Sequence, residues 1–278
     1  MEYYLYLCGV LIIKIMEINK IYNENCLDTM AKMPDNFIDL TVTSPPYDNL
    51  RTHNGYCFDF ENVAKELFRI TKQGGVVVWI VSDATIKGSE TGTSFKQALY
   101  FKEIGFNLHD TMIYAKDAIA FPDSNRYQQC FEYMFVFSKG KPKHLNLIKD
   151  RQNKSFGRKV TGTGRQKDGS MKKATCYGSE IKKYGTRWNI WEMRTAKGGK
   201  IKHPAIFPER LANDHIISWS NESDLVYDCF AGSGTTLKMA ILNNRNWIGS
   251  EISSEYCNII EERIKKAYET KISPDRRR

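Results

Sequence analysis

Short apolar runs alternate along the chain with longer amphipathic stretches. The apolar runs predict buried strands and the amphipathic stretches predict helices. Two of the apolar runs, 106–114 and 132–138, are close enough in sequence to pair antiparallel. Strands that alternate with helices are typical of a doubly wound α/β sheet. The expected strands are 20–22, 38–43, 76–81, 107–114, 133–138, 225–228 and 247–250, and the expected helices are 60–70, 94–104, 208–218, 235–243 and 255–267.

Two short segments, far apart in the sequence, each follow a predicted buried strand. One is Thr-Ser-Pro-Pro-Tyr at 43–47, and the other is Asp-Cys-Phe-Ala-Gly-Ser-Gly-Thr-Thr at 228–236. Open α/β sheets bind their ligands where strands end and loops begin. We therefore expect the two segments to meet at a shared cleft.

The glycine segment has the pattern of a cofactor loop. Gly232 and Gly234 allow a tight turn and close approach of a ligand, and no Gly-Lys-Ser/Thr follows, so the segment is not a phosphate loop. Glu251 follows Gly234 by 17 residues, close to where dinucleotide folds place the acid that binds ribose hydroxyls. Together these features predict a nucleoside cofactor. The alternative is a glycine-rich turn beside a surface glutamate.

The Ser-Pro-Pro-Tyr segment brings three kinds of group together. Two prolines fix the backbone and remove two N–H donors, so that nearby carbonyl groups are held rigidly. The Ser44 hydroxyl and the Pro45 carbonyl can accept hydrogens from an amino group, and Tyr47 can stack on the flat ring that carries it. The alternative is an ordinary Pro-Pro turn with a tyrosine packed over it.

These two motifs together resemble the S-adenosylmethionine-dependent DNA amino methyltransferases, which methylate N4 of cytosine or N6 of adenine. Because the catalytic motif precedes the cofactor motif, the chain is similar to the β class, whose motif order is circularly permuted. Asn25 stands where that family often has aspartate. Further segments that resemble the family lie at 21–28, 74–80, 126–139, 203–205 and 207–211, so that nearly all of 16–267 is covered.

The resemblance implies a Rossmann-like methyltransferase sheet, with mostly parallel strands and one antiparallel strand, and S-adenosyl-L-methionine as cofactor. The implied catalytic residues are Ser44, Pro45, Pro46 and Tyr47. The implied cofactor-binding residues are Asn25, Cys26, Thr43, His203, Pro208, Asp228, Phe230, Ala231, Gly232, Ser233, Gly234, Thr235, Thr236, Glu251 and Ile252. Within this set, Asp228 is expected to pair with the methionine ammonium and Glu251 to hold the ribose.

The implied reaction is methyl transfer to the amine of a base that is flipped out of double-stranded DNA. Within the family, serine at the first motif position favours N4-cytosine and aspartate favours N6-adenine, so Ser44 makes cytosine our first prediction. Adenine N6 is the alternative. An RNA or protein methyltransferase stays open, although such enzymes generally have the cofactor motif first. A non-catalytic DNA-binding protein is the third alternative.

The positive charge is concentrated in one part of the chain. The net charge is +9, but 139–202 holds 19 Lys and Arg against 4 Asp and Glu, and the rest of the chain is net negative. A run of this kind is often only a solvated loop. Between two halves of a catalytic fold, it predicts a DNA-binding, target-recognition insertion. The candidate DNA contacts are Arg158, Lys159, Arg165, Lys167, Lys172 and Lys173, interleaved with Phe156, Tyr177 and Tyr184.

The expected organisation is one domain with an insertion and two extensions. It consists of an N-terminal extension (1–15), a catalytic half (16–140), the basic insertion (141–200), a cofactor-binding half (201–270) and a basic tail (271–278). The apolar stretch 3–15 is too short to span a bilayer, so no membrane association is expected.

Seven cysteines include no Cys-x-x-Cys pair, so no metal site is expected, and their scatter suits a reducing cytoplasm. No proline is followed by cysteine, which argues against the Pro-Cys nucleophile of cytosine carbon-5 methyltransferases. A homodimer and a cognate restriction endonuclease are expected partners, the first because β-class relatives often form dimers.

Overall fold

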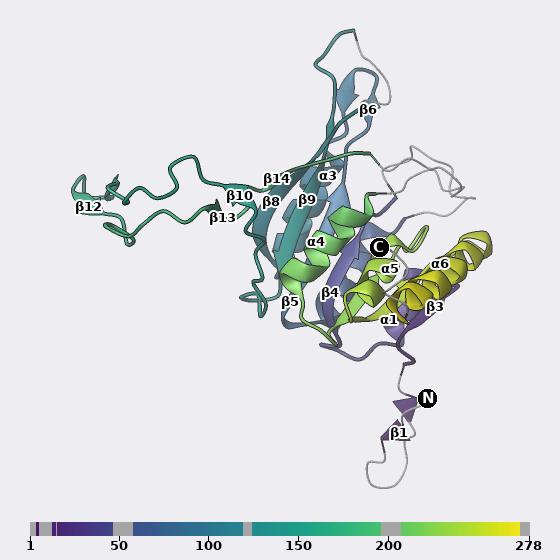
Figure 1. Ribbon diagram of the computed structural model, residues 1–278. Coiled ribbons are helices and arrows are strands. Elements are labelled where there is room, and N and C mark those ends of the chain that lie inside the picture. The colour runs from purple at the N-terminus through teal and green to yellow at the C-terminus, as the bar shows by residue number, and fades with distance from the viewer. Residues whose placement is uncertain are drawn as a thin grey trace. The chain divides into compact units, whose positions relative to one another are not determined.

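The computed structural model describes residues 16–46, 58–118, 124–195 and 207–272, and only the backbone of residues 4–5 and 13–14. Eight strands form one sheet in the order β14-β8-β9-β5-β4-β15-β16-β3 (Figure 1). In chain order these strands are β3 (Lys20–Tyr22), β4 (Ile38–Thr43), β5 (Thr71–Val81), β8 (Asn107–Lys116), β9 (Phe131–Ser138), β14 (Ile190–Met193), β15 (Leu225–Asp228) and β16 (Asn246–Ser250).

The sheet is parallel except for one strand. β9 pairs antiparallel with both β5 and β8, and every other neighbouring pair is parallel. The prediction of mostly parallel strands with one antiparallel strand is therefore confirmed, as is the antiparallel pairing of the two neighbouring runs. The sequence did not predict β14, a short edge strand whose residues alternate between exposed and buried.

Helices cover both faces of the sheet and bury two separate apolar clusters. One face packs against α4 (Glu209–Trp219), α5 (Thr235–Leu242) and α6 (Ser254–Ile272). The other packs against α1 (Cys26–Ala31), α2 (Phe60–Ile70) and α3 (Thr93–Glu103). Figure 1 shows α4 and α5 in front of the sheet and α3 behind it. Five of these helices were predicted to within a few residues, and α1 was not.

The centre of the sheet contains a topological switch point. From β4 the chain continues through α2 to β5, and from β15 it continues through α5 to β16 on the other side. The helices that follow these two neighbouring strands, α2 and α5, lie on opposite faces of the sheet. Open α/β sheets bind their ligands at such a point.

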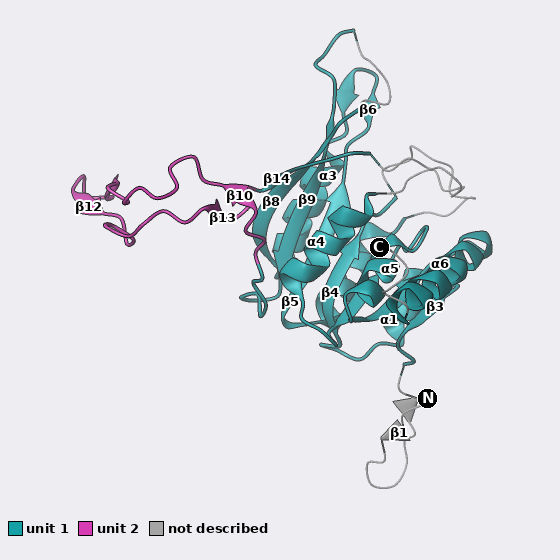
Figure 2. Cartoon of the chain, viewed as in Figure 1, with its two compact units in different colours: residues 1–146, 189–278 teal, residues 147–188 magenta. Residues whose placement is uncertain are grey.

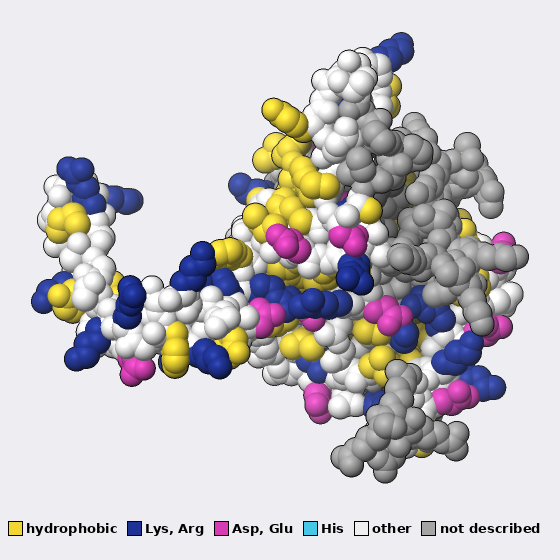
Figure 3. Space-filling model, turned by 45° about the horizontal axis from the view of Figure 1, so that its top comes forward, with side chains coloured by type: hydrophobic (Ala, Val, Ile, Leu, Met, Phe, Trp, Pro, Cys, Tyr) yellow, Lys and Arg dark blue, Asp and Glu magenta, His cyan; other side chains and the backbone are white. Residues whose placement is uncertain are grey.

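Residues Leu147–Trp188 form a second compact unit, unit 2, within the predicted insertion, and the rest of the chain forms unit 1 (Figure 2). Unit 2 is an elongated antiparallel ribbon, in which β10 (Arg151–Gln152) pairs with β13 (Tyr184–Gly185) and β11 (Thr163–Arg165) pairs with β12 (Met171–Lys173). It contains 12 Lys and Arg against 3 Asp and Glu, and Figure 3 shows basic side chains along it.

Two further pairs of short strands are antiparallel. β1 (Tyr4–Leu5) pairs with β2 (Ile13–Lys14), and β6 (Thr85–Ile86) pairs with β7 (Ser89–Glu90). Among the helices of the described part of the chain, none combines the length and the apolar character that a membrane span requires.

Candidate active site

The ends of β4 and β15 lie side by side and carry the two segments that the sequence predicts to meet. At this edge the Thr43 hydroxyl donates a hydrogen bond of 2.7 Å to Asp228 Oδ1, although the two residues are 185 positions apart. Thr43 is fully buried, and Asp228 is only 1% exposed. The structure thus places Ser44, which directly follows Thr43, beside the start of the glycine turn.

The Asp228 carboxyl group is buried and is held by several internal donors. Burial raises its pKa to about 6, although the hydrogen bonds from Thr43 and from the Phe230 backbone N–H act in the opposite direction. The Phe230 N–H donates to the same oxygen as Thr43, at 3.2 Å. Asp228 therefore fixes the end of β15 against the end of β4. A cation bound nearby would lower this pKa again and favour the ionised form.

The Ser-Pro-Pro turn continues directly from β4. Ser44 is half-buried, Pro45 is buried and Pro46 is half-buried. The Thr236 hydroxyl, in the first turn of α5, donates to the carbonyl of Val42 at 3.1 Å. The first turn of α5 and the end of β4 are thus joined at a second point, next to the first.

The glycine turn requires its glycines. Gly232 and Gly234 have φ angles of 52° and 76°, in the left-handed region that favours glycine. A Cβ on Gly234 would also lie 3.0 Å from Ile260 Cγ1 of α6. The turn is anchored to the next strand, because the Ala231 N–H donates to the Ser250 carbonyl at 3.0 Å. Close packing against α6 and β16 leaves the turn little freedom.

Glu251 links the end of β16 to the glycine turn. Its Oε2 accepts a hydrogen bond of 2.8 Å from the Gly232 N–H, and its Oε1 accepts one of 2.9 Å from the Ser253 N–H. Burial raises the pKa of Glu251, and these backbone donors oppose the rise. The carboxylate is therefore held at the position from which it could accept hydrogen bonds from ligand hydroxyls.

The segment before α1 lies against the same carboxylate-bearing loop. Asn23 Nδ2 donates to the carbonyls of Glu251 and Ile252 at 2.9 and 3.1 Å. Asn25 caps α1 by accepting from the Leu27 N–H. Cys26 is buried, which raises its thiol pKa to about 12. Asn23 was not predicted, because a single asparagine after a short strand gives no recognisable signal.

Arg263 of α6 is a second residue that the sequence did not single out. Its side chain is 11% exposed. Its guanidinium donates to the Ser233 carbonyl, to Ser233 Oγ at 2.8 Å and to Thr235 Oγ1 at 3.3 Å. It also pairs at 2.9 Å with Glu209, which Lys238 contacts at 2.6 Å. Although burial alone would raise it, these two cations hold the pKa of Glu209 below its ordinary value. Arg263 thereby fixes the carbonyl between the two glycines.

Most of the other predicted cofactor residues belong to the glycine segment itself. The Phe230 ring contacts Phe58 edge to face, with ring centroids 5.4 Å apart. Ala231, Ser233 and Thr235 are buried. Pro208 is buried at the N-cap of α4.

Some predicted site residues cannot be placed at this site. Tyr47 and His203 lie outside the described residues. Ile252 is 54% exposed, and its carbonyl accepts the hydrogen bond from Asn23. The six candidate DNA contacts are all exposed and lie in unit 2, which we describe by itself: Arg158, Lys159, Arg165, Lys167, Lys172 and Lys173.

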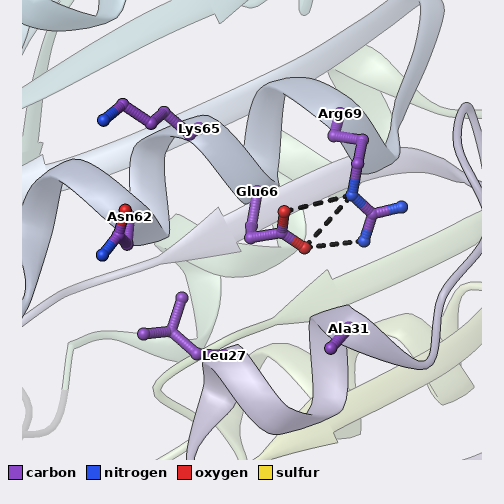
Figure 4. A pocket seen from close by; sticks show the side chains of 6 residues that line it. All are labelled: Leu27, Ala31, Asn62, Lys65, Glu66 and Arg69. Atoms are coloured by element: carbon purple, nitrogen blue, oxygen red, sulfur yellow. Dashed lines mark hydrogen bonds and ion pairs between the residues drawn. The ribbon is translucent and has the colours of Figure 1, made fainter.

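A hollow of about 550 Å³ between α1 and α2 is not part of this site (Figure 4). Arg69 lines this hollow, but its guanidinium already donates hydrogen bonds to Glu66, to Asp35 and to the carbonyls of Met30 and Met33. The hollow therefore offers no unused guanidinium donor to a ligand. It is lined by Leu27, Ala31, Asn62, Lys65, Glu66 and Arg69.

Comparisons with known proteins agree with this geometry. The N6_N4_Mtase family model, described as DNA methylase, matches residues 38–262. The orphan methyltransferase M.BamHII of Bacillus amyloliquefaciens is 61% identical over 236 residues, which are 82% of this chain and 89% of that protein.

Solved structures show the same fold. PvuII DNA methyltransferase, which is cytosine-N4-specific, superposes with a TM-score of 0.63 at 21% identity, and the match covers 91% of this chain and 92% of that one. A Thermus thermophilus protein described as a DNA modification methylase, solved with S-adenosyl-L-methionine, gives a TM-score of 0.60 at 22% identity and covers 89% and 95%.

Proposed function

We propose that this chain, which belongs to the N6/N4 family of DNA methylases, transfers a methyl group from S-adenosyl-L-methionine to the exocyclic N4 amine of cytosine in double-stranded DNA. One observation carries the proposal: Thr43 and Asp228 are hydrogen bonded at 2.7 Å. This contact holds the Ser-Pro-Pro turn and the glycine turn at one edge of the sheet. An acceptor for the amine and a binding loop for the methyl donor would then lie next to each other.

The main task of this arrangement is to orient the amine toward the methyl group. The sulfonium methyl group is already an activated electrophile, whereas the lone pair of an exocyclic amine is delocalised into its ring. Ser44 Oγ and the Pro45 carbonyl would accept the two amine hydrogens and turn the lone pair toward the methyl group. Tyr47 would stack on the flipped base.

The cofactor would lie along the glycine turn. Asp228 would pair with the methionine ammonium. The two carboxylate oxygens of Glu251, which each accept from a backbone N–H group, would also accept hydrogen bonds from the ribose hydroxyls. Asn25 and Cys26, next to the loop of Glu251, would lie near the adenine. Buried Ser233, Gly234 and Thr235 would shape the loop rather than touch the reacting atoms.

Cytosine is proposed ahead of adenine on the chemistry of Ser44. A neutral hydroxyl can donate to the ring N3 of cytosine as well as accept from its amine, whereas a carboxylate at this position could only accept. The same argument applies in part to adenine N1, and the family includes N6 enzymes, so adenine N6 is the second candidate.

The test is to incubate the protein with unmethylated phage λ DNA and the cofactor, and to identify the modified nucleoside by mass spectrometry after complete digestion. We expect N4-methylcytosine from the wild type and little product from Ser44→Ala. Ser89→Ala, in the exposed β6–β7 hairpin, is the matched control and should keep full activity. N6-methyladenine would replace the first proposal by the second. An unchanged rate in Ser44→Ala would refute the role of the serine turn.

Two partners and the location are proposed with this function. A homodimer would be seen by light scattering. A cognate endonuclease would be encoded nearby and would cut only unmethylated sites, although the relative with 61% identity is named an orphan methyltransferase. Free thiols at Cys26, Cys229 and Cys257 support a reducing cytoplasmic location.

A further inference from the structure

A hollow of about 500 Å³ lies where β10 and β13 pair, close to the two ends of unit 2. Its lining includes the cations Arg151 and Lys154, the neutral polar residues Asn153 and Ser155, and the indole of Trp188. No acidic side chain lines it. None of these residues is among the six candidate DNA contacts, which lie further along the ribbon. The hollow therefore presents positive charge, neutral polar groups and one aromatic face.

Arg151 is held in a fixed orientation. Its Nε donates to the Thr186 carbonyl at 3.0 Å, and its guanidinium carbon lies 5.3 Å from the centre of the Trp188 ring. Gly185 makes room for it, because a Cβ there would lie 2.5 Å from Arg151 Nη2. The neighbouring carboxylate of Asp150 pairs with Arg187 instead. Within the described residues of unit 2, Arg151 has no carboxylate partner, so its terminal nitrogens remain available to an external anion.

Trp188 is 69% exposed. An indole is a large apolar group, and leaving it in water forgoes the stabilisation that burial would give. The guanidinium of Arg151 lies over the ring, and the ring also lines the hollow. An exposed aromatic ring beside an oriented arginine is suited to a ligand that combines an anion with a flat or apolar carbon surface.

We propose that this hollow binds one phosphate of the substrate duplex, through Arg151 and Lys154, and packs the adjoining deoxyribose on Trp188. The proposal rests on the DNA substrate of the proposed function. Phosphate contacts fix the position of a protein on DNA without reading the sequence. The hollow would thus anchor unit 2 on the backbone, and the outer part of the ribbon would remain for other contacts.

The test measures DNA affinity by fluorescence anisotropy over a range of KCl concentrations, with a labelled unmethylated duplex of about 30 base pairs as the probe. Removal of one phosphate contact should lower the slope of log K against log salt by about 0.9. For Arg151→Met we expect about tenfold weaker binding and this loss of slope. For Arg151→Lys we expect the slope to be kept, because the charge remains.

Trp188 separates the two parts of the ligand. Trp188→Ala should weaken DNA binding about fivefold without changing the salt slope, because no charge is lost, and Trp188→Phe should restore most of the affinity. Heparin, a polyanion without deoxyribose, should bind Trp188→Ala as it binds the wild type. The weaker binding should raise KM for DNA but not KM for S-adenosylmethionine. Lys265→Met, an exposed lysine of α6, is the matched charge control and should leave both KM values unchanged.

Wild-type affinity and slope in Arg151→Met, or wild-type DNA affinity in Trp188→Ala, would overturn this inference. Circular dichroism of the conservative variants Arg151→Lys and Trp188→Phe checks that unit 2 keeps its fold. Failure of the proposed function would be seen in a different measurement. A wild-type protein that binds the duplex but methylates neither cytosine nor adenine would refute the proposed function, and the DNA affinities of wild type and variants could still be compared.

Discussion

The hydrogen bond between Thr43 and Asp228 makes a sharp prediction about the site. Thr43→Val keeps the shape of the side chain and removes the donor at 2.7 Å from a buried carboxyl group. A hydrogen bond to a charged group contributes about 1.5–3 kcal/mol. Because Asp228 keeps the Phe230 N–H as a partner, we expect Thr43→Val to lower the free energy of unfolding by about 2 kcal/mol at pH 8.

The cost should depend on pH in a defined direction. The pKa of Asp228 is raised from its ordinary value of 3.8 to about 6 in the folded protein, so this group makes the protein less stable as pH rises through that interval. Loss of a donor that favours the ionised form raises the folded pKa further. At pH 5 the group is largely protonated in both folded variants, and the cost of Thr43→Val should be clearly smaller than at pH 8.

Urea unfolding of both proteins at pH 5 and pH 8 measures this difference, and carbon-13 NMR of the carboxyl groups can follow the titration of Asp228 directly. Asp228→Asn is the matched background. It removes the charge, so Thr43→Val should cost about 1 kcal/mol there and show no pH dependence in this range. An equal cost at pH 5 and pH 8 in the wild-type background would refute this account of the contact.

Three further predictions concern the glycine turn, which we propose to bind the cofactor. Arg263→Lys should raise the Kd for S-adenosylmethionine about tenfold by calorimetry, because the guanidinium fork that holds the Ser233 carbonyl is lost. Lys265→Met, an exposed lysine of α6, is the control and should keep the wild-type Kd; similar Kd values in the two variants would contradict this role of Arg263. Gly234→Ala should lower the free energy of unfolding by about 2 kcal/mol, because the new Cβ meets Ile260 of α6 in addition to the backbone strain. Gly88→Ala, at a similar left-handed φ but with no atom near the new Cβ, should lower it by only about 1 kcal/mol. Equal losses in urea unfolding would exclude an effect of packing on α6. Glu251→Gln should weaken cofactor binding at least about tenfold, because the amide of glutamine cannot accept from both the Gly232 and the Ser253 N–H groups. The DNA affinity measured by anisotropy should not change. Loss of both cofactor affinity and DNA affinity would indicate unfolding instead.

Much of the central sheet could be predicted from the sequence, because its strands are short segments rich in aliphatic and β-branched residues. β4 and β15 have the predicted bounds, and every residue of both is buried. The edge strand β14 has only two buried residues, which is too weak a pattern to distinguish from a loop. The helix α1 is six residues long, and its periodicity cannot be recognised over fewer than two turns.

The site residues that belong to sequence motifs could be predicted, whereas the residues outside the motifs that hold these motifs in place could not. Thr43 is the last residue of β4 and Glu251 directly follows β16, and both could be predicted from these positions. Arg263 lies in a charged stretch of α6 that resembles a solvated helix face, and only packing against the glycine turn turns its side chain inward. Asn23 acts by contacts to backbone carbonyls 228 and 229 positions away, for which a sequence carries no local sign.

The order of motifs along the chain has little influence on the site, because the site is defined by strand neighbours. β4 and β15 adjoin each other in the sheet although most of the chain separates them. The helices that follow these strands, α2 and α5, lie on opposite faces of the sheet. A chain that began with the glycine turn could form the same strand neighbours. The order of the two motifs therefore reflects how the chain is connected, whereas the contact of Thr43 with Asp228 shows where the two motifs meet.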